Sequence, residues 1–327
     1  MAGCEEGLKE MRLHRPIGIA SLAFALQLAA MQAGLAWGPQ GHRIVALLAG
    51  HLLQQSDPAV HAKMLALLAG DRSDRSRRRT KIDLAGEATW LDTLIEKSPE
   101  ARDAMAAWNA TRLKPDHPDI AAACFGHTPL PAGYPASHGP RENCSLDKVA
   151  QFERELKNPG SSPSARATAV RFLLSLVPDL NDPLLAIDEG DQGGFCVALQ
   201  VEAKPPVRLA TYWDETLVAV AAGHNAARGA AALATAIGTA ERSGWAQGGP
   251  QAWLQDSFEV AKTVTYSFMA EQPAGKHTFA AAPGEPCPTV NLYRVGPDYE
   301  RKALAAVRTQ LAKAGVRLAA VLRDSLK

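Results

Sequence analysis

The chain has 327 residues with 35 basic and 34 acidic side chains, so its formal net charge is +1. A charge so close to balance excludes any argument for a polyanionic partner from overall electrostatics alone. A chain of this length can bury a large hydrophobic core in one or two domains.

The first 36 residues predict a cleavable export signal. Met1–Glu10 is polar and mildly acidic, so Met11 is an alternative start that gives a basic segment, MRLHRP, before the apolar run. Small residues at Gly34 and Ala36 occupy the −3 and −1 positions of a cleavage site. An uncleaved anchor is the alternative, because about 20 apolar residues can span a bilayer. We expect a mature chain that starts at Trp37, without membrane contact, and that is secreted or periplasmic.

After the leader, apolar residues recur with helical periodicity in three clear stretches. These are GHRIVALLAGHLLQQ (41–55), ARATAVRFLLSLVPDL (165–180) and YERKALAAVRTQLAKAGVRLAAVL (299–322). Alanine-rich sequence at 226–246 adds further good helix formers. The one candidate strand is FCVALQV (195–201). We therefore predict an all-α single domain over residues 37–327, with long irregular loops and room for one short hairpin.

Two irregular segments interrupt the helical pattern. DRSDRSRRRTK (71–81) is a basic loop that we interpret as a solvated connection. CFGHTPLPAGYPASHGPRENC (124–144) is rich in proline and glycine and predicts a surface loop. Four cysteines follow the leader, and an even number in an exported chain predicts two disulfides, with all three pairings open. They are Cys124, Cys144, Cys196 and Cys287.

Four short segments carry the candidate ligands of a metal site. They are WGPQGH (37–42), TWLD (89–92), SLVPDLNDPLL (175–185) and YWDETLV (212–218). Taken singly each is weak, because a lone His42 is more often a helix-start residue, and Asp92 or Asp214 could lie on a solvated helix face. Their order behind a signal cleavage site is more specific.

In this order the segments resemble the secreted zinc-dependent single-strand nucleases of the S-one/P-one type. The resemblance runs from Trp37 to the C-terminal AGVRLAAVL. It implies the all-α fold shared with bacterial zinc phospholipase C, and a metal-dependent hydrolase acting on single-stranded nucleic acid or nucleotides. It also implies that the free amine and carbonyl of Trp37 bind zinc, which only cleavage before Trp37 would allow. Nitrogen and carboxylate donors suit that metal.

The resemblance further implies three zinc ions with nine protein ligands. Trp37, His42 and Asp179 match one zinc, Asp92 the second and Asp214 the third. Asp92 and Asp179 are also the candidate catalytic residues. The other four positions, where the family has histidines, hold Asn109, Ser175, Leu185 and Ala210. A lone carboxylate binds zinc weakly, so we expect one zinc at Trp37, or at most two.

Other positions also depart from the family pattern. Ile95 stands where an arginine is expected, Phe195 replaces the asparagine of a Gly-Gly-Asn segment, and Pro178 replaces a glycine and is expected to bend the helix that carries Asp179. We interpret His51 as a packed or rim residue. Shifted ligands are conceivable only in and around the long loop, at His117, His127 and His138.

Two main hypotheses follow, and the sequence leaves open whether the protein is an enzyme. The first is a divergent nuclease with a reduced zinc centre and a low rate. The second is a non-catalytic secreted binding protein that keeps the fold and at most one zinc. A third, weaker alternative is an unrelated helical periplasmic protein. A monomer is assumed throughout.

Overall fold

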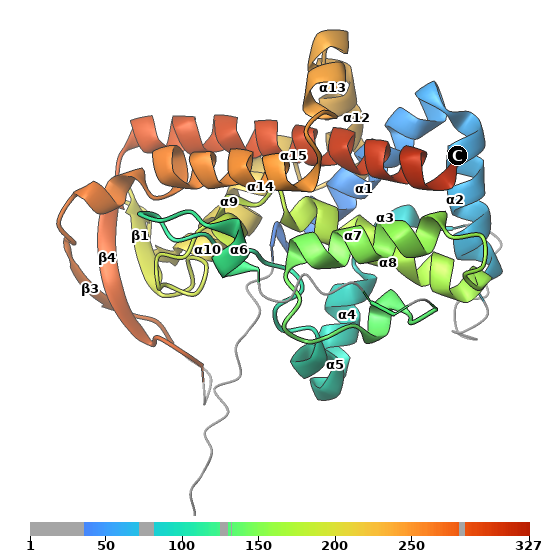
Figure 1. The fold of residues 1–327 in the computed structure, drawn as a ribbon. Helices are drawn as coiled ribbons and strands as arrows, with labels where there is room; N and C mark the ends of the chain where they lie inside the picture. The colour runs from blue at the N-terminus through green and yellow to red at the C-terminus, as the bar shows by residue number, and fades with distance from the viewer. Residues whose placement is uncertain (1–35, 72–81, 125–129, 132, 281–284) are drawn as a thin grey trace, which may run out of the picture.

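The computed structural model describes residues 36–71, 82–124, 130–131, 133–280 and 285–327. The predicted export signal, most of the basic loop and His127 lie outside these residues. The described chain is mostly helical with one small sheet, which confirms the predicted fold class. In Figure 1, α15 extends along the helical body, and β1, β3 and β4 gather at one end.

Seven longer helices form the body of the fold, and each begins or ends at residues that favour a helix terminus. Proline occupies the first turn of several of them, where its missing N–H costs nothing, and Ser162 caps α8 by accepting the Ala165 N–H over 3.1 Å. These helices are α1 (Gly38–Ser56), α2 (Pro58–Gly70), α7 (Ser145–Lys157), α8 (Pro163–Asp179), α12 (Ala226–Ala236), α14 (Gly249–Val260) and α15 (Pro297–Leu326).

Shorter helical segments connect the longer helices. Before α8 they are α3 (Leu84–Ala88), α4 (Trp90–Lys97), α5 (Pro99–Ala104), α6 (Ile120–Ala123) and η2 (Ala136–His138). After α8 they are α9 (Pro183–Ala186), α10 (Leu209–Thr211), η3 (Tyr212–Leu217), α11 (Val218–Ala222), α13 (Thr239–Trp245), η4 (Ala261–Thr265) and η5 (Ser267–Ala270). The segment η3 is a π-helix, a form that is rare and often lies at functional sites.

The centre of the core is the contact between α1 and α15. Apolar residues of both helices, such as Leu48 and Leu318, are fully buried, and each buried leucine contributes about 1.5–3 kcal/mol. Gly315 allows the close approach, because a Cβ there would lie 2.4 Å from Cδ2 of Leu48. One cluster of buried apolar residues extends from Trp37 in the chain to Leu326.

The sheet has the strand order β2-β1-β4-β3. The strand β1 (Val197–Val201) confirms the strand predicted from FCVALQV, and it pairs antiparallel with β2 (Val207–Arg208) as a short hairpin. The sequence reading missed β3 (Gly275–Thr278) and β4 (Thr289–Val295), which pair antiparallel with each other, while β4 pairs parallel with β1. The alternating burial along β4 corresponds to the alternation of polar and apolar residues in TVNLYRV, which is a strand signal that the sequence itself contains.

Two disulfides are present, as the cysteine count predicted. Cys124, at the end of α6, is bonded to Cys144, immediately before α7, so the proline-rich loop is closed at its base. Cys196 is bonded to Cys287 and joins the start of β1 to the segment before β4. Within the part of the chain that the structure describes, no helix is both long and apolar enough to cross a membrane.

Candidate metal centre

Trp37 is fixed immediately before α1 by both of its N–H groups. The indole Nε1 donates to the carbonyl of Pro178 over 3.0 Å, and the backbone N donates to Oδ2 of Asp182 over 3.1 Å. The side chain is fully buried, and the backbone is left-handed with φ 50°. The carbonyl of Trp37 accepts the Gly41 N–H over 3.0 Å and so closes the first turn of α1. The start of α1 is thereby held against the end of α8.

His42, in the first turns of α1, lies between two carboxylates from other helices. Its Nε2 is 2.9 Å from Oδ1 of Asp179, the last residue of α8. Its Nδ1 is 3.6 Å from Oδ2 of Asp92 in the first turn of α4, and neither of these two atoms has a hydrogen-bond partner. Pro178 lies in the last turn of α8, and the helix continues through it to Asp179.

The electrostatics of this group favour a charged imidazole. Burial lowers the pKa of His42, but the hydrogen bond to Asp179 and the charge of the nearby Asp92 outweigh burial and raise that pKa to about 10. Burial also raises the pKa of Asp179 to about 6, against the opposing effect of His42. One imidazolium therefore interacts with two carboxylates.

Two further carboxyl groups lie beside this trio. Asp182 is 1% exposed and caps α9 by accepting the Leu184 N–H over 2.8 Å. Asp214, in the π-helix η3, is 6% exposed, and its carboxyl is in hydrogen-bonding contact with that of Asp182. Burial raises the pKa of Asp182 to about 7 and that of Asp214 well above its usual range. We refer to His42, Asp92, Asp179, Asp182 and Asp214 as the acidic site.

Four of the five residues predicted as ligands thus belong to the acidic site, and Trp37 borders it through Asp182. Asp182 was missed because the family pattern assigns it no role. Its position as a helix cap before Pro183 was a signal that the side chain would be held in place. The structure places Ser175 and Leu185 in the interior and leaves Asn109 and Ala210 half-buried. None of these four offers an imidazole.

Arg112 is a second residue that the sequence reading missed. Its guanidinium lies in the electrostatic neighbourhood of Asp182, Asp188 and Asp191, and its Nε is buried without a hydrogen-bond partner. Burial lowers the pKa of Arg112, against the effect of those carboxylates. Its electrostatic interaction with Asp182 relates Arg112 to the acidic site, whereas Ile95 occupies the position where the family pattern has an arginine.

The other candidate histidines show no role in the acidic site. His51 is exposed and its Nε2 is 2.9 Å from Nε2 of Gln55. His117 and His138 are exposed, and the ring of His138 packs against Tyr134 with 6.3 Å between centroids.

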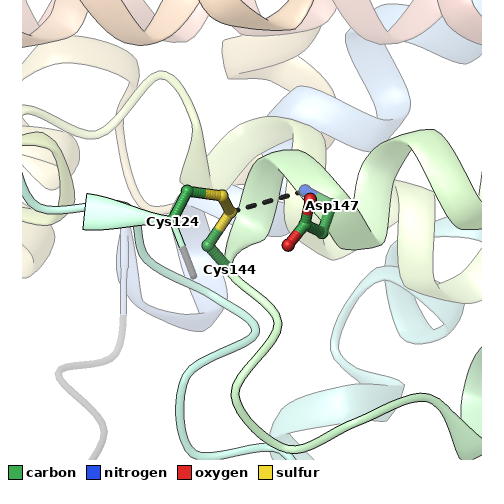
Figure 2. A group of neighbouring side chains, drawn as sticks. All are labelled: Cys124, Cys144 and Asp147. Carbon is green, nitrogen blue, oxygen red and sulfur yellow. Dashed lines mark hydrogen bonds between the residues drawn. A yellow bond between two sulfur atoms is a disulfide. The ribbon is translucent and has the colours of Figure 1, made fainter. Parts of the chain in front are cut away.

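One tight group of metal-type donors lies elsewhere, around Cys124, Cys144 and Asp147 (Figure 2). The two sulfur atoms are bonded to each other, so neither is a free thiolate ligand. The Asp147 N–H is directed at the sulfur of Cys144 over 3.5 Å, as an N-terminal contact of α7. This group is a disulfide at the N-terminus of α7 and not a metal site.

The donors of the acidic site can be compared with the needs of zinc. Among the described residues, no other set of three such donor atoms lies within 4.8 Å of one another, so the acidic site is arranged in pairs. The three-zinc centre requires several imidazoles, whereas this site has only His42. Its residues do not fit three zinc ions. His42 and Asp179, together with the nitrogen of Trp37 that is bonded to Asp182 of the same site, offer the donor types for one.

A comparison with known protein families found a match over the predicted mature chain. The model of the family described as S1/P1 Nuclease, the S-one/P-one type, matches residues 37–327. The match begins at Trp37, the predicted first residue of the mature chain. A comparison with curated proteins found no match.

Proposed function

Because the chain belongs to the S1/P1 nuclease family, which indicates a nuclease-type hydrolase, we propose the following more specific function. The protein is exported, is cleaved before Trp37 and hydrolyses phosphodiester bonds in single-stranded nucleic acid at a low rate. The observation that carries this proposal is the His42 side chain held between Asp92 and Asp179, at the positions that the family uses.

One zinc ion is part of the proposal. Trp37, His42 and Asp179 would hold it, and a bound zinc polarises phosphoryl oxygens and lowers the pKa of bound water. The buried indole of Trp37 and its bond to Pro178 would orient the terminal nitrogen. Asp92, whose side chain is less buried than that of Asp179, would accept a proton from an attacking water.

The low rate follows from the missing donors. Phosphodiester cleavage by metal clusters depends on two ions that stabilise the attacking and the leaving oxygen together. Leu185 and Ala210 supply no ligand, so such a cluster cannot form with the family's donors. The alternative is a secreted binding protein without activity, and the missing donors at Leu185 and Ala210 favour it as well.

The experiment uses protein whose first residue is Trp37. Cleavage of single-stranded DNA and RNA is measured at mildly acidic pH, with and without zinc, and bound zinc is counted by metal analysis. We expect about one zinc per chain, slow zinc-dependent cleavage, and at least a roughly tenfold loss with His42→Asn, as for other losses around metal sites.

Two controls make the result decisive. His51→Asn changes an exposed histidine of the same helix and should leave cleavage unchanged. A chain with one extra residue before Trp37 should lose zinc, because the Trp37 nitrogen is then part of a peptide bond and is no longer a free amine. If no cleavage is detected in any metal, the binding-protein alternative holds. If three zinc ions bind, the reduced centre is wrong.

A further inference from the structure

A pocket of about 440 Å³ lies between the proline-rich loop, the C-terminal half of α7 and the start of α8. We call it the loop pocket. Ligand pockets in proteins commonly measure about 300–1,000 Å³, so this one can hold a small organic molecule. Ala165 of α8 is part of its wall, whereas Asp179 of the acidic site ends the same helix. The 17 residues of α8 extend over about 25 Å, so the loop pocket is separate from the acidic site.

Tyr134 gives the loop pocket an aromatic wall. A turn in the loop holds this residue, because its N–H donates to the carbonyl of Pro131 over 3.0 Å. Gly133 has the left-handed backbone, with φ 78°, that such a turn requires before its last residue. The Tyr134 side chain is 49% exposed, and its ring packs edge-on against His138 at an angle of 76°. A half-exposed ring in a pocket wall is a surface on which a planar ligand can stack.

Two consecutive residues of α7, Arg154 and Glu155, bring charge to the same pocket. Arg154 is exposed, and its guanidinium forms no hydrogen bond or ion pair within the described chain. Oε1 of Glu155 accepts the N–H of Ala136 over a long 3.4 Å, and Oε2 is buried without a hydrogen-bond partner. A buried carboxylate oxygen in this state costs free energy until it receives a donor. Both side chains can therefore bind further groups.

Two cationic side chains lie near Glu155 without bonding to it. Lys148 and His138 both act on its carboxyl electrostatically. The ammonium of Lys148, however, donates to the carbonyl of Ala136 and to Oε1 of Gln151. Burial has the largest influence on Glu155 and raises its pKa, against the effect of these cations. The charge of Glu155 is thus compensated in part, while its Oε2 still lacks a donor.

We propose that the loop pocket binds a guanine nucleotide, with the base between Tyr134 and Glu155 and the phosphate at Arg154. Nucleobases stack on aromatic side chains, and guanidinium groups bind phosphate. Guanine presents a ring N–H and an amino group side by side, which a carboxylate can accept together. Adenine and cytosine place a ring acceptor beside their amino group, and a carboxylate repels that acceptor. Membership of a nuclease family makes nucleotides a ligand class that this chain encounters, and the proposal does not depend on cleavage at the acidic site.

The test uses mature protein that starts at Trp37 and is loaded with one equivalent of zinc. Calorimetry measures the binding of guanosine monophosphate (GMP), adenosine monophosphate (AMP) and guanosine. We expect one GMP per chain and an affinity for AMP that is weaker by at least about tenfold, since a good bidentate pair discriminates by that much. Guanosine should bind about tenfold more weakly than GMP, because it lacks the phosphate that Arg154 binds.

Two variants test the two charged side chains. Glu155→Gln should abolish the preference for GMP over AMP, because an amide replaces one acceptor oxygen with a donor. Arg154→Met changes an exposed residue and should weaken GMP to the affinity of guanosine, without changing the affinity of guanosine itself. The matched control is Glu153→Gln on the same helix, whose carboxylate pairs with Lys157 and which should leave all three affinities unchanged.

His42→Asn separates the loop pocket from the acidic site and should leave GMP affinity unchanged. If GMP binding is lost in His42→Asn and kept in Glu155→Gln, the nucleotide binds at the acidic site and the proposal is wrong. Equal affinities of the wild type for GMP and AMP would also overturn it. In His42→Asn protein, a short oligothymidylate with one guanine that binds more tightly than GMP assigns the pocket to a strand, and weaker binding assigns it to the free nucleotide. GMP binding without nucleic-acid cleavage would overturn only the proposed function, and cleavage without GMP binding only the loop pocket.

Discussion

Two buried charged clusters include residues at different points of α8, and they differ in how their charges are compensated. In the first, Arg171 bonds to Asp71 over 2.5 Å and to Glu87 over 2.6 Å, and all three side chains are almost completely buried. We call it the scaffold cluster. In the second, the acidic site, the carboxylates outnumber the one imidazole.

The difference shows what each cluster can do. In the scaffold cluster the guanidinium presents fixed donors to both carboxylates, so every charge has its partner inside the protein. Such a cluster ties α2 and α3 to α8 and needs nothing from outside. In the acidic site Oδ1 of Asp214 has no hydrogen-bond partner within the described residues. A site of this kind is completed by a ligand, which is why we assign function there.

The largest effect is expected from Arg171→Met, which tests whether the scaffold cluster is self-sufficient. Removing the cation leaves two buried carboxylates without their partner, and breaking a buried ion pair in this way costs about 3–5 kcal/mol. The free energy of unfolding, measured in urea, should fall by that amount, with or without divalent ions. Arg301→Met, on the exposed face of α15, is the control and should change it by less than about 1 kcal/mol. A small loss in Arg171→Met would mean that the cluster is not structural.

An intermediate effect is expected from His42→Asn in the acidic site. The substitution removes the hydrogen bond to Asp179 and the positive charge next to Asp92. Hydrogen bonds to charged groups contribute about 1.5–3 kcal/mol, so metal-free protein should lose about that much stability. Unlike the loss in Arg171→Met, this loss should grow when zinc is added, because only the wild type keeps the imidazole that binds it. Equal losses with and without zinc would remove the distinction between the two clusters.

The sequence predicted the parts of both clusters that depend on local pattern or family spacing. The helical periodicity placed Asp179 at the end of a helix, and the family spacing related it to His42 and Asp92. The pairing of Arg171 with Asp71, one hundred residues earlier, left no periodic signal. It is a tertiary contact between separate elements, which the pattern within either element does not specify.

Asp182 and β4 were missed for related reasons. Asp182 follows an asparagine and precedes a proline, so locally it is only a helix cap. Its contacts with Trp37 and Asp214 arise from the packing of α1 and η3. The parallel pairing of β4 with β1 likewise joins distant segments, although the alternation within β4 was readable.

The smallest net effect is expected at a third buried charge, Lys148 of α7, which has no carboxylate bonded to its amine among the described residues. Its Nζ donates to the carbonyl of Ala136 and, over 2.6 Å, to Oε1 of Gln151, and it lies 3.7 Å from the ring centre of Trp108. Neutral oxygens and an aromatic face compensate the charge only in part. Burial accordingly lowers the pKa of Lys148 from 10.5 to about 7, although Glu155 and Asp147 act in the opposite direction.

The sign of the pH dependence follows from this lowered pKa. Between about pH 7 and pH 10.5 the unfolded chain binds more protons at Lys148 than the folded chain does, so stability rises with pH across that window and is lost as the pH falls through about 7. Lys148→Met removes this dependence and the hydrogen bonds together, so its net effect near pH 7 should stay within about 1.5 kcal/mol. Relative to the wild type, the variant should be more stable at pH 6 and less stable at pH 9, as measured by urea unfolding. If the difference does not change sign or size with pH, the Lys148 amine is charged throughout, and a buried cation in this fold needs no carboxylate partner.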